Sequence, residues 1–348
     1  MLKASEVKRM AREAGFDLCG IAPAEAFPEL KYFDTWLAAG HAGEMRYLSR
    51  SAARRADVRN VVPAARSVVA LGVIYNTDRP YSTEVGDPDA ALISRYAWGE
   101  DYHDVLGRRA DALLAEMREA CDEPFEARWY VDTGPVQERV YAQYAGLGWI
   151  GKNTCLIHPE QGSWIFLGEI ITSLALEPDA PQLDQCGTCT LCIEACPTDA
   201  LREPWVLDST RCLSYLTIEL RGPIPETWRD AIGTHVYGCD ICQDVCPYNH
   251  PAARSGDAAW RPRPALDQPT LIDLWRRSDA DTQALLADSA MSRAKLNGFR
   301  RNVAVALGNR GTAAARAALD ASGGAERAST RDPVVAEHVA WARRRDEP

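Results

Sequence analysis

The first half of the chain alternates between continuous apolar runs and segments with apolar residues at helical spacing, which is typical of mixed α and β structure. An opening helix is indicated by Val7, Met10, Ala11 and Ala14, which recur at intervals of one turn. Apolar runs predict buried strands at 66–76, 127–133 and 162–176. Helices are predicted near 103–121 and at 135–147, the second opened by Pro135.

Two further regions follow, each introduced by a segment rich in Pro and polar residues. Residues 178–185, PDAPQLDQ, have the composition of a linker, and HPAARSGDAAWRPRP follows Asn249. From Leu271 onward, Ala, Leu and Arg recur at helical spacing, which predicts two or three pairs of helices. A chain of 348 residues suggests two or three domains, and we expect them at 1–177, 178–250 and 251–348.

The spacing of the cysteines is the most specific chemical signal in the chain. Cys186-x2-Cys189-x2-Cys192-x3-Cys196-Pro197 reproduces the bacterial ferredoxin run that binds 4Fe–4S clusters. The second run, Cys239-x2-Cys242-x3-Cys246-Pro247, lacks its first cysteine, expected at Val236, and Cys212 is the obvious replacement. The fourth cysteine of each run ligates the other cluster in two-cluster ferredoxins. We therefore assign Cys186, Cys189, Cys192 and Cys246 to one cluster, and Cys196, Cys212, Cys239 and Cys242 to the other.

Zinc and disulfides are the alternative uses of these cysteines. Disulfides favour small secreted chains, and zinc sites usually lack the third closely spaced cysteine and the Cys-Pro ending. Two iron–sulfur clusters are therefore the preferred interpretation, with electron transfer as the leading theme. Cys19, Cys121 and Cys155 lie outside the two runs and are expected to be small buried apolar residues.

Charge and hydropathy limit the location and the partners of the protein. The N-terminus has no apolar core of signal-peptide length and no segment reaches transmembrane length, so a cytosolic protein with reduced thiols is expected. The net charge is −10, yet residues 247–316 contain 11 Lys or Arg and 6 Asp or Glu, a local excess of +5. This segment is either a phosphate-binding surface or an ordinary solvated helical face.

Three short segments before the cysteines are candidate sources of chemistry. Asp132 ends a predicted strand and precedes a predicted helix, where α/β ligand sites collect, although helix capping would also explain it. Residues 148–154 resemble a phosphate loop but lack its first glycine, which excludes nucleotide hydrolysis. Residues 101–107 resemble the D-x-H-x-x-G motif of cobalamin-ligating proteins, but Leu106 replaces the glycine. A hydrogen-bonding or packing role is therefore expected for His103.

Six segments together resemble one family. VDTGPVQER, GWIGKNT, GSWIFLGEI, CGTCTLCIEACPTDAL, RCLSYLTIELRGPIPE and YGCDICQDVCPYN occur in the order seen in epoxyqueuosine reductases. The resemblance spans nearly the whole chain. It implies an enzyme with cobalamin and two 4Fe–4S clusters that reduces epoxyqueuosine at the tRNA wobble position to queuosine. It also implies an α+β fold: a nitroreductase-like α/β cobalamin-binding domain, a ferredoxin-like domain and a C-terminal HEAT-like helical-repeat domain that binds tRNA.

The same resemblance implies roles for individual residues. Asp132 is expected to be the proton donor, kept protonated near neutral pH by a desolvated pocket over the corrin ring. The clusters would pass electrons to cobalamin, whose reduced cobalt attacks the epoxide or its adjacent carbon while Asp132 supports loss of the oxygen as water. Expected cobalamin contacts are Arg55, Tyr96, His103, Asp132, Arg139, Lys152, Asn153, Gly168 and Glu169. Expected contacts to the tRNA anticodon region are Ser214, Tyr215, Thr217, Glu219, Leu220 and Arg221, with Arg293, Lys295, Arg300, Arg301 and Arg310 on phosphates.

The partners implied are tRNA and an external electron donor of the ferredoxin or flavodoxin type, and nothing in the sequence demands more than a monomer. A reductive dehalogenase is the alternative enzyme, but such enzymes usually carry an export signal and lack the helical tail. A ferredoxin-like electron carrier or a tRNA-binding partner is the non-enzymatic alternative. Absence of cobalamin binding would favour that last alternative.

Overall fold

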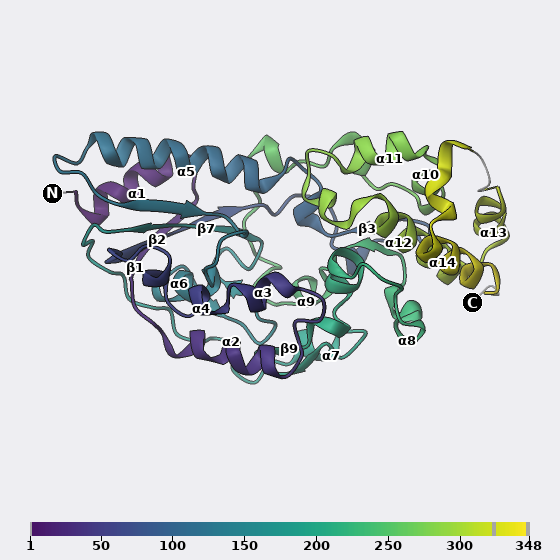
Figure 1. Cartoon of the computed structure of the whole chain (residues 1–348), viewed down its shortest axis with the longest axis horizontal. Helices are drawn as coiled ribbons and strands as arrows, with labels where there is room; N and C mark the ends of the chain where they lie inside the picture. The colour runs from purple at the N-terminus through teal and green to yellow at the C-terminus, as the bar shows by residue number, and fades with distance from the viewer. Residues whose placement is uncertain (1, 322–324, 346–348) are drawn as a thin grey trace.

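A four-stranded antiparallel sheet organises the N-terminal half of the computed structural model, which describes residues 2–321 and 325–345 (Figure 1). Its strands follow the order β1 (Leu18–Pro23), β2 (Ser67–Ile74), β7 (Ile165–Thr172) and β4 (Ala127–Tyr130). Every residue of β2 is buried, as its unbroken apolar run predicts for a strand covered on both faces. The three predicted strands are thus confirmed, each with shorter ends than expected.

Helices cover both faces of this sheet. The helices α1 (Ala4–Glu13) and α5 (Tyr102–Glu119) pack on one face, where Val69 and Leu71 of β2 meet Met10 and Leu113. On the other face, α2 (Pro28–Ala38) and α6 (Glu138–Tyr144) pack against alternate residues of β2. Two short helices, α3 (Arg46–Arg50) and α4 (Ala52–Arg55), complete this layer. Figure 1 shows α1 and α5 above the sheet and α2 and α6 below it.

One predicted helix begins later than expected. The sequence predicts a helix at 135–147 opened by Pro135, but α6 begins at Glu138 and ends at Tyr144. The preceding residues form a tight turn instead, because Asp132 takes the left-handed conformation with φ of 56°. This turn points residue 132 away from the end of the strand, which determines the geometry of the site described below.

The cysteine runs form a region with short elements. Each Cys-x2-Cys pair leads into a single helical turn, α7 (Leu191–Glu194) or α9 (Ile241–Asp244). Around them lie α8 (Glu226–Arg229) and three strand pairs: β5 (Trp149–Ile150) with β6 (Leu156–Ile157), β8 (Leu201–Glu203) with β9 (Val206–Leu207), and β10 (His235–Tyr237) with β3 (Leu92–Ile93). The pairing of β10 with β3 is parallel and ties the cysteine region to the N-terminal half.

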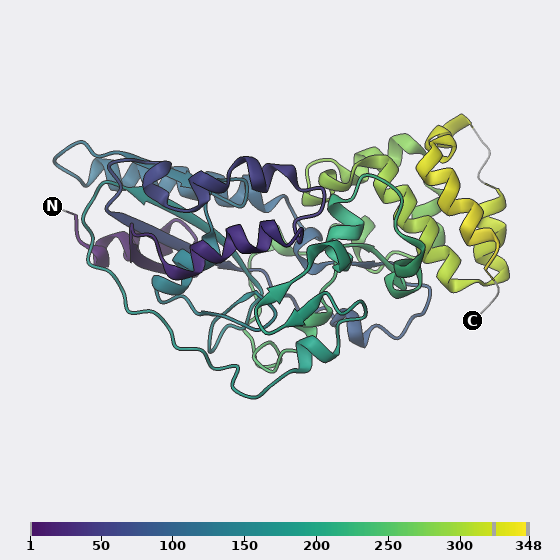
Figure 2. The same cartoon turned by 60° about the horizontal axis from the view of Figure 1, so that its bottom comes forward.

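Helices dominate the end of the chain, as the periodicity from Leu271 predicts. They are α10 (Leu271–Arg276), α11 (Asp279–Leu286), α12 (Lys295–Arg310), α13 (Ala313–Asp320) and α14 (Pro333–Arg343). The central helix α12 is buried along most of its length, and its core continues into residues 213–237 of the cysteine region. Figure 2 shows these helices gathered at the end of the molecule opposite the N-terminus.

The polar segment 178–185 is anchored to the sheet domain at one residue. The Asp179 carboxylate accepts the main-chain N–H of Ile21 at 2.8 Å and pairs with Lys8 at 2.5 Å. In the part of the chain that is described, no helix is long and apolar enough to cross a membrane.

Candidate functional site

A cavity of about 500 Å³ lies where the sheet domain meets the cysteine region. The N-terminal half contributes aromatic residues and Asp132, and the cysteine region contributes thiols and the π-helical turn η5 (Tyr215–Glu219). Polar lining residues other than the cysteines include Ser94, Asn153, Ser163, Ser214 and Gln243. The cavity therefore joins the predicted acid–base residue and predicted metal ligands in one space.

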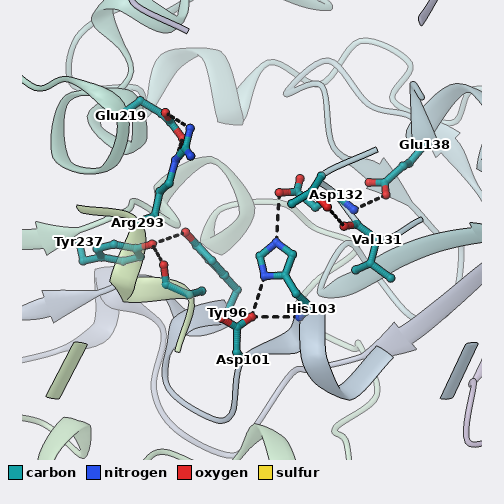
Figure 3. Close-up of polar contacts among 11 residues, drawn as sticks. Tyr96, Asp101, His103, Val131, Asp132, Glu138, Glu219, Tyr237 and Arg293 are labelled. Atoms are coloured by element: carbon teal, nitrogen blue, oxygen red, sulfur yellow. Dashed lines mark hydrogen bonds and ion pairs between the residues drawn. The ribbon is translucent and has the colours of Figure 1, made fainter. Parts of the chain in front are cut away.

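Asp132 lies beside His103 in this cavity (Figure 3). His103 is in the first turn of α5, where Asp101 caps the helix by accepting the His103 main-chain N–H at 3.0 Å. The same Asp101 oxygen lies 2.6 Å from His103 Nδ1, and His103 Nε2 lies 3.4 Å from Asp132 Oδ2. The imidazole is thus held between two carboxylates, which confirms the hydrogen-bonding role expected for His103.

This arrangement favours the protonated form of His103. Burial opposes a charge on the imidazole, but the hydrogen bonds and charges of Asp101 and Asp132 outweigh it and raise the pKa of His103 to about 9. Burial likewise opposes the charge of Asp132, yet the hydrogen bond and charge of His103, with a hydrogen bond from Tyr102, lower its pKa. The neighbouring His103 cation thus favours the ionised form of Asp132, and protonation of Asp132 by a desolvated pocket over a corrin ring stays a prediction.

Two further carboxyls lie near Asp132: Glu138, which also lines the cavity, and Glu169, which is 2% exposed. Glu138, the first residue of α6, accepts the main-chain N–H of Asp132 at 2.5 Å. Burial and the Asp132 charge raise the pKa of Glu138 to about 8, so this carboxyl is protonated at neutral pH. Burial and Glu138 raise the pKa of Glu169 on β7 well above its ordinary value. The site thus favours the ionised form of Asp132 and the neutral forms of Glu138 and Glu169 close to one another.

The seven cysteines of the two runs and Cys212 gather into two sets. The outer set is Cys186, Cys189, Cys192 and Cys246, and the inner set is Cys196, Cys212, Cys239 and Cys242. In the outer set, burial and the thiols of Cys186 and Cys189 raise the pKa of Cys192 to about 11, and burial with Cys186 and Cys192 nearby raises that of Cys246 to about 11. In the inner set, burial and Cys212 raise the pKa of Cys239 well above its ordinary value, with Cys196 also contributing.

These proximities agree with the two groups expected from the ferredoxin spacing, and the assignment of four ligands to each cluster stays a prediction. In the described residues, no three Cys, His, Asp or Glu converge as closely as one bound metal ion requires. Four thiols gathered at each place suit a multinuclear cationic centre, because a bound metal ionises thiols whose pKa is otherwise raised. The inner set lines the cavity, whereas the chain around the outer set is exposed from Pro181 to Thr190 except at Cys186 and Cys189.

The residues expected to contact cobalamin divide into two groups. Tyr96, Asp132, Arg139 and Asn153 line the cavity. Asn153 is almost completely buried and donates to the main-chain oxygen of Cys242 at 3.2 Å, which also connects it to the inner set.

The other expected contacts lie outside the lining of the cavity. The Lys152 ammonium donates to the main-chain oxygens of Gly187 and Cys189 at 2.6 and 2.9 Å, so it holds the outer cysteine loop. Arg55 donates to the main-chain oxygen of Val136 at 2.7 Å and therefore supports the turn that carries Asp132. Gly168 and Glu169 lie on β7 beside Tyr130 of β4. His103 does not line the cavity itself but contacts Asp132, which does.

The mouth of the cavity contains several of the expected tRNA contacts. Ser214, Tyr215 and Glu219 line the cavity, and Arg293 forms an ion pair with Glu219 at 2.8 Å. The Arg293 guanidinium also lies 5.3 Å from the ring centre of Tyr47, an exposed tyrosine of α3. Arg221 and Lys295 are exposed, whereas Arg310 is half-buried and bonded to Asp89.

Two of the expected phosphate-binding arginines are inside the protein. Arg300 and Arg301 are each 1% exposed on the buried helix α12. Arg300 donates to the main-chain oxygens of Trp275 and Arg277 at the end of α10. Direct contact with tRNA is therefore wrong for both residues, because their guanidinium groups satisfy carbonyls at the ends of other helices.

The main-chain carbonyls to which Arg301 donates belong to the segment that was expected to border the tRNA anticodon. Arg301 donates to the main-chain oxygens of Leu216, Leu220 and Gly222 at 2.6 to 2.8 Å. Thr217 is also inside, where its hydroxyl donates to the oxygen of Leu213 and accepts from Gly238. Direct tRNA contact by the Thr217 side chain is therefore wrong as well, and η5 presents other residues to the cavity.

The cavity includes aromatic residues that sequence reasoning missed. Tyr75, Tyr102 and Phe166 form a stacked series, with ring centres 4.2 Å apart for Tyr75 and Phe166 and 4.5 Å for Tyr102 and Phe166. Tyr75 follows a buried strand and Tyr102 precedes His103 at the start of a helix. Their positions at the ends of predicted elements could therefore have indicated that these aromatic residues line the site. Tyr47 had no such signal, because α3 reaches the cavity only through tertiary packing.

Comparison with known families gives two matches within the chain. The family described as "Epoxyqueuosine reductase QueG, DUF1730" matches residues 55–133, and "4Fe-4S double cluster binding domain" matches residues 185–249. An epoxyqueuosine reductase of Gloeobacter violaceus is 46% identical over 90% of this chain and 98% of its own length. One of Xanthomonas campestris pv. campestris is 41% identical over 97% of this chain and 95% of its own length.

Solved structures agree with these sequence matches. An epoxyqueuosine reductase crystallised with an epoxyqueuosine-modified tRNA-Tyr stem loop has a TM-score of 0.85 and 31% identity, covering 97% of this chain and 88% of its own. The Bacillus subtilis epoxyqueuosine reductase, solved with an aspartate catalytic loop swung out of the active site, has a TM-score of 0.84 and 29% identity with the same coverage.

Proposed function

The chain belongs to the epoxyqueuosine reductase family, and from this premise we propose that it reduces the epoxide of epoxyqueuosine at the wobble position of tRNA to give queuosine. The observation that carries the proposal is that Asp132, with His103 beside it, faces the same cavity as the inner cysteine set. Removing the epoxide oxygen as water consumes two electrons and two protons. The pair of Asp132 and His103 could supply protons, and clusters bound by the inner cysteine set could supply electrons to the same cavity.

Two 4Fe–4S clusters and cobalamin are the cofactors of this proposal. The match to a double cluster domain supports the clusters, with the outer set nearer the surface and the inner set at the cavity. The residues at the cavity also fit cobalamin, because hydroxyl and amide groups there suit the amide side chains of a corrin. Tyr96, Arg139 and Asn153 are the proposed contacts. When bound, cobalamin would supply a strongly reducing metal centre.

Asp132 is the proposed proton donor to the departing oxygen, and His103 is its proton source. In the open site the imidazolium holds the proton, with Asp101 stabilising it from the other nitrogen. Cofactor and substrate covering the cavity would remove water from Asp132 and raise its pKa toward that of His103. One of the two protons then passes from His103 Nε2 to Asp132 and on to the oxygen, and bulk water supplies the second. The aspartate catalytic loop described for the Bacillus subtilis relative supports this assignment.

Transfer RNA is the proposed substrate, as the relative crystallised with a modified stem loop supports. Ser214, Tyr215 and Glu219 are positioned to border the inserted nucleotide, while Arg221, Arg293 and Lys295 are exposed enough to meet phosphates. Affinity should fall as salt increases if these cations bind the backbone. The electron donor, the monomeric state, the cytosolic location, the three domain boundaries and the nitroreductase-like and HEAT-like similarities stay predictions.

Anaerobic turnover tests the proposal directly. Protein with reconstituted clusters, a strong reductant and epoxyqueuosine-containing tRNA is incubated with or without cobalamin, and the digested nucleosides are weighed by mass spectrometry. Loss of one oxygen only when cobalamin is present is the expected result. No loss in protein that contains both clusters and cobalamin would show that the substrate is a different one.

A further inference from the structure

The turn that carries Asp132 has a backbone conformation that needs support from outside the turn. Asp132 has φ of 56°, a left-handed conformation that is costly for a residue with a side chain. The next main-chain N–H, of Thr133, donates to the oxygen of Val131 at 2.5 Å and closes a three-residue turn. An unsupported turn of this kind would relax, and the Asp132 carboxylate would then leave His103.

Two side chains from outside this segment bind its main chain. Arg55 donates to the oxygen of Val136 at 2.7 Å near the end of the segment. At its start, Glu138 Oε1 accepts the Asp132 N–H at 2.5 Å, and Figure 3 shows Glu138 on the opposite side of Asp132 from His103. The Glu138 contact is made at the strained residue itself. Its loss would leave the Asp132 N–H without this acceptor.

We propose that Glu138 is a positioning residue whose carboxyl oxygen, by accepting the main-chain N–H of Asp132, holds the segment 131–137 in the conformation that directs Asp132 to His103. This inference rests on the proposed function only for its kinetic consequence. The role asks for a hydrogen-bond acceptor of this length and not for a negative charge. The neutral state of Glu138 near pH 7 is consistent with it, since a carboxyl group keeps an acceptor oxygen when protonated.

Three variants of the full, cluster-containing chain test the proposal. Glu138→Gln keeps an acceptor oxygen, Glu138→Leu keeps the volume without an acceptor, and Asp132→Asn keeps the main-chain N–H but removes the carboxyl. Hydrogen–deuterium exchange of peptides covering residues 131–137 reports the closure of the segment. Single-turnover loss of oxygen from the tRNA nucleoside reports the chemistry, and its dependence on tRNA concentration separates rate from affinity.

Glu138→Leu should raise the exchange of this segment and lower the single-turnover rate about 3- to 10-fold, the effect of losing one partly exposed hydrogen bond. The tRNA concentration for half-maximal rate should stay within about twofold. Glu138→Gln should restore both readouts to near wild type. Asp132→Asn should lose the rate while the exchange stays low, which separates a missing acid from an open turn.

Two results would overturn the proposal. One is wild-type exchange in Glu138→Leu, and the other is a Glu138→Gln variant as impaired as Glu138→Leu, which would assign the effect to the acid itself. If Glu138→Leu does not retain its clusters, Glu138→Ala removes the acceptor without adding bulk and is read in the same way. Should the wild type fail to act on this tRNA, the proposed function would be wrong, while the exchange data would still decide the role of Glu138.

Discussion

His103 should have a pKa well above that of an ordinary histidine, and replacing its partner Asp132 should lower this pKa. Although burial opposes the charge, the hydrogen bonds and charges of Asp101 and Asp132 raise its pKa from 6.5 to about 9. Each pKa unit corresponds to about 1.4 kcal/mol, so the shift amounts to about 3 kcal/mol in favour of the imidazolium. The Asp132 side chain is 62% exposed, and solvent screening should reduce this to about 1 to 2 kcal/mol.

The sign of the pH dependence follows from the raised pKa. Because the folded state binds the His103 proton more tightly, this stabilisation is fully present below pH 6.5 and is lost as the pH rises through about 9. The same proton is the one proposed to reach the substrate through Asp132. The turnover rate should therefore fall on the alkaline side as His103 loses its proton.

Histidine NMR measures this directly. In protein labelled with 15N-histidine, one of the six imidazoles should titrate well above pH 7, and its signal should be absent in His103→Gln. Asp132→Asn should lower that midpoint but leave it above 6.5, since Asp101 still accepts from Nδ1. A midpoint below 7 in the wild type, or one unchanged in Asp132→Asn, would refute the reasoning.

Three further predictions follow from the contacts described. Cys246→Ser should lose the outer cluster and keep the inner one, whereas Cys196→Ser should lose the inner cluster and keep the outer one. Iron content and EPR measure which cluster remains. Loss of the inner cluster in Cys246→Ser and of the outer cluster in Cys196→Ser would contradict the pairing. Lys152→Met should release the outer cysteine loop and lower iron by about half with no change in tRNA affinity, and unchanged iron would rule out this role. Arg301→Met leaves three main-chain carbonyls without their donor and should lower the Tm by roughly 5 °C or more. Arg293→Met, at an exposed residue, should change the Tm by only about 1 to 2 °C and should instead weaken the salt dependence of tRNA binding. Equal Tm shifts in the two variants would refute this distinction.

The sequence by itself determined the features that depend on short-range spacing. Several ligands of a cluster lie at short fixed intervals along a tight loop, so the two cysteine runs were predictable, and the match to a double 4Fe–4S cluster domain supports them. The replacement by Cys212 and the exchange of Cys196 and Cys246 between sets stay predictions. The buried strand β2 was predictable because a strand covered on both faces is apolar throughout. The motif VDTGPVQER indicated Asp132 because it resembles a family, while its position at a strand end was only compatible with a site.

Only the tertiary structure decided which charged residues face the cavity and which support it. Arg300 and Arg301 look like a phosphate-binding pair in sequence, yet they lie on the inner face of α12, where carbonyls from distant helix ends meet them. Lys152 sits in a matched motif but reaches the outer cysteine loop, and Tyr47 reaches the mouth from a helix with no marked pattern. The protonation of Asp132 and Glu138 likewise depends on His103 and on burial. These outcomes depend on groups far apart in the chain, and hydrophobic periodicity does not encode the distances between them.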